Sequence, residues 1–338
     1  MKATSYSFSA GVLVFSATVL ALPALYRRVA EQSKVLECFA KAIGSGSWPS
    51  DCAAAAATDV GIVRQIGLLD LGIDFSVGDA QSLGISSSKL TATLLSVGPG
   101  WPVTEAKYHV AIVDNNNTIG AFETNFTSTT VKGESLESVI QPSILTIAPG
   151  QAKNFGSFVA ALISQAEHPF LLRGNADATL KTTAPPFTPI PATFKVNGVG
   201  FESPITLRGC NNFPKVDYVE QVGLTLDPNG KTFTLTSRFD ITNPSQLNLN
   251  LGDVTFQAVN KDAVVVGTAF VKDMKLNIGI TTVTAVITSS SMETYDALLK
   301  EGATLTFQGF DGSSASPILV EGLKLMKIAA VIPKQNKL

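Results

Sequence analysis

The sequence predicts a mainly β protein of two tandem antiparallel β-sandwiches. Each carries one short inserted helix, and an N-terminal signal or anchor helix precedes both. Three observations predict this fold: apolar residues that alternate with period two, turn residues that interrupt the alternation, and an internal repeat. The clearest stretch is 233–267, where Phe233, Leu235, Phe239 and Ile241 alternate with smaller or polar residues until an Asn-Pro pair ends the run.

Residues 1–28 are interpreted as a signal or anchor with a possible propeptide. Lys2 gives a short positive region, and the segment from Phe8 to Leu25 is largely apolar. Ala24 ends a tolerable cleavage site, and Arg27-Arg28 resembles a dibasic processing site of the fungal secretory pathway. The competing interpretation is an uncleaved anchor, because the apolar length lies at the lower limit for spanning a bilayer. Interruptions by Ser, Thr, Gly and Pro favour the cleaved signal and a secretory route.

Residues 29–57 form a cysteine-containing segment. Cys38 and Cys52 flank a loop rich in Gly and Ser, and an oxidising compartment makes a disulfide between them the leading expectation. Cys210 could instead pair with either of them. No metal site is expected, because three cysteines without close spacing and two histidines do not supply a ligand set.

Two glycosylation sequons agree with a secretory route. Asn116 and Asn125 each begin an Asn-x-Thr triplet in or beside a predicted turn. We therefore expect both side chains to lie at the surface as glycan acceptors.

The two sandwiches are placed at 58–210 and 211–338, since the chain repeats itself. Residues 111–120 align with 258–267, each a hairpin that ends in Gly, and Gly174 aligns with Gly309. The boundary falls at 209–215, where GCNNFPK interrupts two alternating runs. The Pro-rich stretch 184–191 is interpreted as a stiff loop inside the first sandwich.

One amphipathic helix is expected late in each copy, near 151–167 and 292–300. Ser290 as N-cap with Glu293 three residues later predicts a capping box for the second helix. The apolar stripe of each helix is expected to pack on its own sheet, although it could also dock a partner or a membrane.

The stretch around the Asn-Pro pair resembles the water-stress, or type 2 late-embryogenesis-abundant, domain. The whole chain resembles fungal secretory and vacuolar proteins of unknown function with such domains, a group that includes a regulator of vacuolar acidification. The resemblance covers 216–333 most clearly and 58–210 more weakly. It implies that the two sandwiches are immunoglobulin/fibronectin-like and that they carry no catalytic residues. The matching residues are Phe239, Ile241, Asn243, Pro244, Leu249, Leu251, Gly252, Val254, Phe256 and Gly267.

The Asn243-Pro244 pair itself is predicted to be a structural turn. Proline fixes its own φ, lacks an N–H and disfavours helical backbone at the residue before it. The pair should therefore end one strand and redirect the chain into the next.

Neither the net charge nor the sequence motifs indicate nucleic-acid binding or catalysis. The net charge of −2, without a run of Lys or Arg, argues against a nucleic-acid partner. A nucleophile elbow, a P-loop and a dinucleotide-binding turn are absent from the sequence. His109 is expected on the solvent face of a strand, and His168 at the end of the first helix. The carboxylates of Asp70, Asp74 and Asp79 are expected to face solvent.

The sequence thus predicts no enzyme activity, no cofactor and no metal. Its first functional hypothesis is a binding or structural protein of the secretory pathway, secreted, at the cell surface or at the vacuole, with a protein or membrane complex as partner. A membrane-anchored regulator of a vacuolar membrane complex is one variant of it. The alternative is a carrier of a lipid or other apolar ligand. An apolar cavity of several hundred Å³ would favour the carrier, and a packed core with one exposed apolar patch would favour the interaction module.

Overall fold

The structure is a computed structural model that describes residues 37, 38, 41, 51, 63–94, 103–182 and 192–335. The described chain is mainly β, with 63% of its residues in strands and 13% in helices. None of its helices has the length and apolarity needed to cross a membrane. The predicted signal or anchor, Cys52 and the Pro-rich stretch 184–191 lie outside the described residues.

The first half of the structure, residues 63–208, has nine strands and one helix. They are β1 (Val63–Asp74), β2 (Ser82–Leu94), β3 (Val103–Asp114), β4 (Asn117–Glu123), β5 (Thr127–Ser128), β6 (Thr130–Lys132), β7 (Ser135–Ile147), α3 (Ala152–Ser164), β8 (Glu167–Thr182) and β9 (Ala192–Arg208). The second half, residues 215–332, has seven strands and two helices. They are β10 (Lys215–Leu226), β11 (Phe233–Asn243), β12 (Leu247–Val259), β13 (Val265–Leu276), β14 (Gly279–Ser289), α4 (Met292–Lys300), β15 (Ala303–Gln308), α5 (Pro317–Leu323) and β16 (Lys327–Ile332).

The two halves have the same strand order. In the first half the neighbours are β1-β2-β7-β4-β3-β8-β9, and in the second half they are β10-β11-β14-β13-β12-β15-β16. Each helix-containing connection also corresponds, because α3 joins β7 to β8 and α4 joins β14 to β15. Gly120 and Gly267, which the sequence repeat aligns, lie in the equivalent strands β4 and β13.

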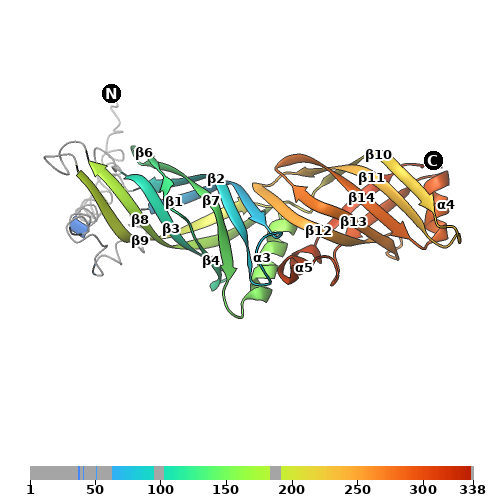
Figure 1. Ribbon diagram of the computed structural model, residues 1–338, viewed down its shortest axis with the longest axis horizontal. Helices are drawn as coiled ribbons and strands as arrows, with labels where there is room; N and C mark the ends of the chain where they lie inside the picture. Colours follow the sequence, from blue (N-terminus) through green and yellow to red (C-terminus); the bar gives the residue numbers. More distant parts are fainter. Residues whose placement is uncertain are drawn as a thin grey trace, which may run out of the picture.

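Alternating side chains build both cores. In β11 and β12 buried positions alternate with partly exposed ones for most of each strand. This is the pattern expected when one face of a strand packs on a core and the other meets solvent. The molecule is elongated, and the two halves lie end to end with the C-terminus at the far end of the second half (Figure 1).

One connected sheet joins the halves, which the sequence did not predict. The end of β1 pairs in parallel with the start of β12, from Leu71 opposite Leu247 to Asp74 opposite Asn250. Further backbone bonds extend the contact, including Phe75 N–H to Asn250 O at 2.8 Å. All 16 described strands consequently belong to one sheet instead of two separate sets.

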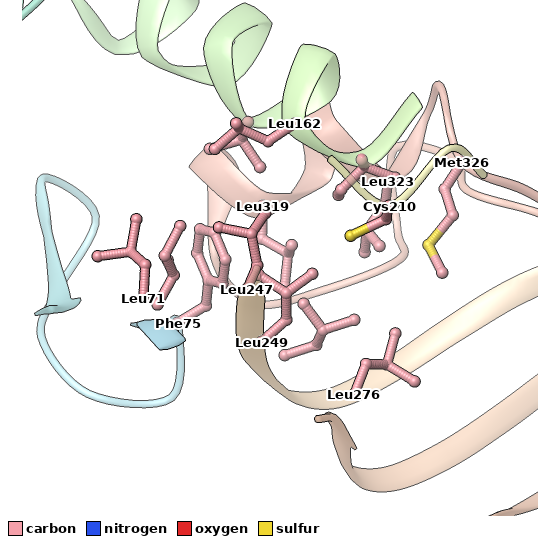
Figure 2. Close-up of a cluster of buried hydrophobic side chains, with 14 of the residues drawn as sticks. Leu71, Phe75, Leu162, Cys210, Leu247, Leu249, Leu276, Leu319, Leu323 and Met326 are labelled. Carbon is pink, nitrogen blue, oxygen red and sulfur yellow. The ribbon is translucent and has the colours of Figure 1, made fainter. Parts of the chain in front are cut away.

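A shared apolar core fills the junction between the halves (Figure 2). Leu71 and Phe75 from the first half lie beside Leu247 and Leu249 of β12, and all four side chains are at least nine-tenths buried. Helices α3 and α5 come from different halves and lie side by side there (Figure 1). Their approach is close: a Cβ on Gly322 would lie 2.7 Å from a methyl carbon of Val159. Helix α3 also contacts its own sheet, as expected, because Phe158 packs edge-on against Phe170 of β8. Its packing on α5 of the other half was not expected.

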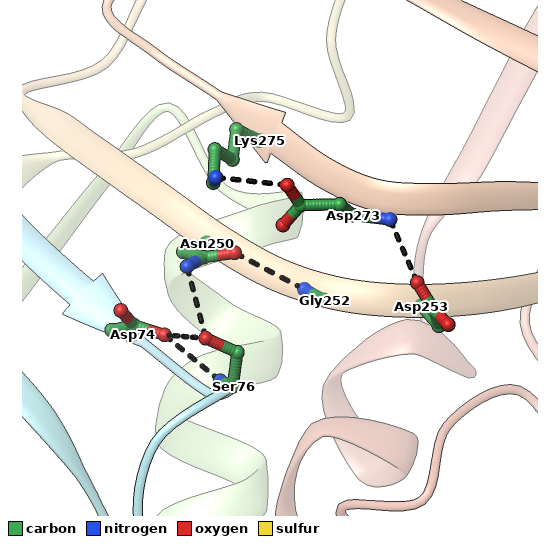
Figure 3. A network of polar contacts seen from close by, with 7 residues as sticks. All are labelled: Asp74, Ser76, Asn250, Gly252, Asp253, Asp273 and Lys275. Carbon is green, nitrogen blue, oxygen red and sulfur yellow. Dashed lines mark hydrogen bonds and ion pairs between the residues drawn. The ribbon is translucent and has the colours of Figure 1, made fainter.

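A polar network covers the seam where β1 meets β12 (Figure 3). The Asp74 carboxylate accepts hydrogen bonds from the Ser76 N–H at 2.9 Å and its hydroxyl at 2.6 Å. The Asn250 amide donates to the same hydroxyl at 3.0 Å, and its oxygen accepts from the Gly252 N–H at 3.3 Å. The two halves are thus joined by backbone, apolar and side-chain contacts together.

The starts of α4 and α5 differ from what the sequence predicted. The N-cap of α4 is Ser291, whose hydroxyl accepts from the Thr294 N–H, and not Ser290. Glu293 is then one position too early to complete a capping box. The sequence analysis also missed α5, although Ser316 caps it and Pro317 follows at its first turn, which is a recognised start signal.

Candidate functional site

An apolar cavity of about 90 Å³ lies inside the first half. It lies between the inward faces of seven of the nine strands of that half, and the surface that lines it is apolar. Its lining residues are Val63, Ile66, Leu90, Ala92, Leu94, Val103, Ala106, Tyr108, Val110, Phe122, Leu136, Ile140, Leu172, Ala176, Ala178, Leu180, Val199 and Phe201.

Side-chain size explains why this core is hollow. Four alanines from three strands, Ala92, Ala106, Ala176 and Ala178, face the cavity. The equivalent position in the second half has a gap of only about 30 Å³. Three phenylalanines and a methionine, Phe239, Phe256, Phe307 and Met274, fill the space there.

Strand length contributes to the difference as well. Strands β8 and β9 have 16 and 17 residues, whereas their equivalents β15 and β16 have six each. Ala176, Ala178 and Leu180 lie on the part of β8 that extends beyond the length of β15. The cavity therefore occupies the extension of the first half that points away from the second half (Figure 1).

Tyr108 forms part of the cavity wall and is 93% buried, with 7% of its surface exposed. Burial raises the pKa of its hydroxyl, and the nearby Ser138 and Thr129 hydroxyls oppose that rise. Within the described chain this hydroxyl still makes no hydrogen bond of normal geometry. Its buried phenol is therefore not a ready proton donor at neutral pH.

A second hollow, of about 640 Å³, lies on the outer face of β3, β4, β7 and β8. Ala111, Ala121 and Gly174 are among its lining residues, and their small size helps to leave this surface hollow. A Cβ on Gly174 would lie 1.9 Å from the His109 carbonyl oxygen, so only glycine fits where these two backbones meet.

His109 borders this hollow and lies between two carboxylates, which the sequence analysis did not expect. Its Nδ1 is 3.0 Å from Glu123 Oε2, and its Nε2 is 3.4 Å from Asp177 Oδ2. Lys107 also pairs with Glu123, and this contact, with His109, holds the pKa of that carboxyl below its usual value. The prediction that His109 faces solvent is confirmed, since a third of its side chain is exposed.

The chemistry of this hollow is limited. A histidine between carboxylates can relay a proton, but the lining residues include no serine or cysteine to act as nucleophile. The described chain also contains no group of three or more potential metal ligands. Asp177 already accepts from the Gly198 N–H at 2.8 Å, where β8 and β9 shift register. We interpret the cluster as a structural contact that holds β3, β4 and β8 together.

His168 lies in β8, so the prediction that it ends the first helix is wrong. That helix ends at Ser164, and His168 reaches back to the β3–β4 hairpin. Its Nε2 is 3.0 Å from Asp114 Oδ1, and both side chains are about nine-tenths buried. The pair fixes the hairpin against the start of β8.

The three aspartates do not converge. Asp70 accepts from the Ser88 hydroxyl at 2.7 Å, and Asp79 accepts from the Gln81 N–H at 2.8 Å. Asp74 belongs to the junction network described above. Each therefore supports a turn or a strand pair near its own position.

Both glycosylation candidates lie at the surface of the first half. Asn116 is exposed at the tip of the β3–β4 hairpin, where its φ of 63° is left-handed. Asn125 is exposed too, but Thr127 of its sequon is buried and donates to the Ala106 carbonyl at 3.3 Å. Modification of Asn125 would therefore have to precede folding of this segment.

The cysteines fall into two environments. Cys38 is buried and disulfide-bonded, while Cys210 is a free, fully buried thiol. The alternative that joined Cys210 to another cysteine is therefore wrong. Cys210 packs in the junction core, where burial raises the pKa of its thiol to about 12.

The Asn243-Pro244 turn lies at the boundary between β11 and β12. Asn243 is almost fully buried. Its amide donates to the carbonyls of Leu247 and Leu276, at 2.8 and 3.1 Å, and its oxygen accepts from the Ser245 N–H at 3.0 Å. The sequence analysis assigned the turn to proline geometry and missed this clamp, although buried Asn is a common source of such bonds.

Comparisons with known proteins give little functional information. The family model described as "Protein of unknown function (DUF3712)" matches residues 121–258, which is under half of the chain and extends from β4 to β12. No curated protein matches.

Two solved structures resemble the chain weakly. One is a protein of unknown function from Porphyromonas gingivalis W83, with 11% identity and a TM-score of 0.18, which covers 80% of this chain and 98% of that one. The other is the partial N-terminal region of an enterococcal surface protein, with 7% identity and a TM-score of 0.17 over 80% and 96% of the two chains.

Proposed function

We propose that this chain is a non-catalytic binding or structural protein of the fungal secretory pathway, built as a rigid rod from two tandem β-sandwiches of immunoglobulin/fibronectin type. The observation that carries the proposal is the junction between the halves. Parallel pairing of β1 with β12, the shared core and the packing of α3 on α5 all oppose bending there.

Rigidity matters because inter-domain motion is the usual expectation when two units share a small polar interface. Here a continuous strand ladder crosses the interface, and Leu71, Phe75, Leu247 and Leu249 are buried in it. Bending would break those backbone bonds and expose the core. A rod holds surfaces on its two halves at a fixed spacing for one partner complex.

The ends of the rod suggest how it is used. β1 begins at the end of the first half that points away from the second half, and the C-terminus lies at the opposite end (Figure 1). If residues 1–28 serve as an anchor, the second half projects away from the membrane toward a partner. This geometry suits a regulator of a vacuolar membrane complex, and with a cleaved signal it suits a secreted or cell-surface protein.

A second candidate function is a carrier of an apolar ligand. The cavity in the first half supports it, although about 90 Å³ is well below the several hundred Å³ of a site that encloses a whole ligand.

Two measurements test the proposal. A copy tagged at the C-terminus should reach the vacuole, cell surface or medium, and a cytosolic location would refute the secretory part. Small-angle scattering of the purified chain should fit one elongated body without a hinge. Gly322→Leu should loosen α3 from α5 and broaden the distribution of distances, whereas Gly223→Leu in β10, where an added Cβ has no atom within 4 Å, should not.

A further inference from the structure

An apolar strip on the outer face of the first half leads into the hollow of about 640 Å³. Ile144 and Val77 belong to this strip and are 52% and 43% exposed. Ile144 lies opposite Gly84 in the β2–β7 ladder, and a Cβ on Gly84 would lie 2.7 Å from a methyl carbon of Val77. The two large side chains are therefore neighbours, and Ile144 also lines the hollow. A contiguous exposed apolar surface with a polar rim is typical of a binding site.

The strand register places a floor of small side chains beside this strip. One row of side chains crosses four strands, each residue opposite the next: Thr146 of β7, Ala121 of β4, Ala111 of β3 and Arg173 of β8. The two alanines in the middle carry only a methyl group each, while longer side chains stand at both ends. The row therefore leaves room for one apolar side chain between Thr146 and Arg173.

The charges around the hollow leave the guanidinium end of Arg173 available. Glu123 and Asp177 both face His109, and Glu202 accepts a hydrogen bond from Arg173 Nε at 2.6 Å. The two Nη nitrogens of Arg173 make no hydrogen bond or ion pair with the described residues, and 57% of this side chain is exposed. Paired guanidinium N–H groups match the two oxygens of a carboxylate. An occupant of this edge of the hollow should therefore carry a carboxylate.

We propose that this hollow docks an extended segment of a protein partner, in which an apolar residue and an acidic residue stand two positions apart. Side chains with that spacing point to the same side, about 7 Å apart. The apolar side chain packs on the methyl groups of Ala111 and Ala121, and the carboxylate binds Arg173. A small ligand is a poorer occupant, because its site usually buries at least about 70% of its surface and a hollow on the face of a sheet does not. This inference rests on the binding role proposed above and names a surface and a partner chemistry for it.

The test uses the full chain with isotope-labelled methyl groups of isoleucine and alanine, so that the signals of Ile144, Ala111 and Ala121 report on the hollow. The probe is acetyl-Leu-Gly-Asp-amide, and the comparison peptides are acetyl-Leu-Gly-Asn-amide and acetyl-Gly-Gly-Asp-amide. The probe should shift these methyl signals saturably with a Kd on the order of 1 mM. Each comparison peptide lacks one of the two contacts and should bind at least about fivefold more weakly.

Two exposed positions give variants that should keep the fold. Arg173→Gln should remove the preference for the Asp peptide over the Asn peptide, and Ala121→Leu should occupy the floor and weaken binding at least about fivefold. One matched control is Arg238→Gln, which changes an exposed arginine of the second half that pairs with Glu220. The other is Ala329→Leu, on an exposed position of β16. Both controls should change affinity less than about twofold.

Several results would overturn the proposal: no saturable shift of the hollow's methyl signals, equal affinity for the Asp and Asn peptides, or undiminished binding by Ala121→Leu. Equal binding of the peptide without leucine would overturn it as well, because the hollow would then be an anion site only. An elongated scattering profile without a hinge, found together with no peptide binding, would refute this surface and leave the rod unaffected.

Discussion

The two halves share one strand order but differ in what fills and closes them. In the second half, phenylalanines fill the centre and the first half plugs one end. In the first half, alanines leave a larger cavity. Duplication of a fold therefore need not duplicate its interior. The side-chain volumes at a few inward positions determine whether the core of a half is fully packed or contains a cavity.

The largest expected effect concerns the side chains of the first half that close one end of the second half. Phe75→Ala removes a mostly buried ring from the junction core and should lower the free energy of unfolding by about 3–5 kcal/mol. Because the core is shared, chemical denaturation should still show one transition at lower denaturant. Phe126→Ala is the control, since this phenylalanine is 46% exposed and its loss should cost under about 0.5 kcal/mol. Equal effects of the two changes would mean that Phe75 does not close the second half.

The turn at the start of β12 should matter nearly as much. Asn243→Ala leaves the buried carbonyls of Leu247 and Leu276 without their side-chain donor and should cost about 2–3 kcal/mol. Pro244→Ala keeps those bonds and should cost about 1 kcal/mol or less through chain entropy. Thermal unfolding measures both. A larger loss for Pro244→Ala would show that proline geometry, and not the asparagine clamp, holds the turn.

The same substitution in the two interiors sharpens the comparison. Ala285→Leu enlarges a residue beside the 30 Å³ gap of the second half and should destabilise by about 1–3 kcal/mol through overpacking. Ala106→Leu fills part of the larger cavity of the first half and should stay within about 1 kcal/mol of the wild type. The denaturant midpoints of the two variants, each compared with that of the wild type, measure this difference. Similar losses in both would mean that the first half is not effectively hollow.

Much of the fold was predictable because its evidence is local. Period-two alternation located β11 and β12, and an internal repeat aligned Gly120 with Gly267 in equivalent strands. The pairing of β1 with β12 was not predictable, since it joins residues far apart in the chain and leaves no local pattern. The Ser316-Pro317 start of α5 was a readable signal that was overlooked.

The candidate site was less accessible to sequence reasoning. Ala92, Ala106 and Ala176 are ordinary strand residues until the register places them around one cavity. The approach of Asp177 and Glu123 to His109 likewise depends on which residues face each other across three strands. A cavity depends on both the strand register and the side-chain volumes. The sequence gives the side-chain volumes directly, but it does not give the register.

The smallest expected effect concerns the outer face of the first half. Lys107, followed by His109, lowers the pKa of Glu123, so the folded state favours the ionised carboxylate. The resulting stabilisation is present above the unfolded pKa, near 4.5, and is lost as pH falls through the folded value. Glu123 is exposed, so solvent and salt screen the effect.

Glu123→Gln should therefore lower the melting temperature by at most about 1–2 °C at pH 7. The difference from the wild type should shrink below about pH 4 and in high salt. Glu134→Gln is the matched control, because Glu134 is exposed and has no ion pair within the described chain. A loss that persists at low pH would mean that Gln disturbs the β3–β4 packing itself. The outer hollow would then depend on the shape of this side chain and not on its charge.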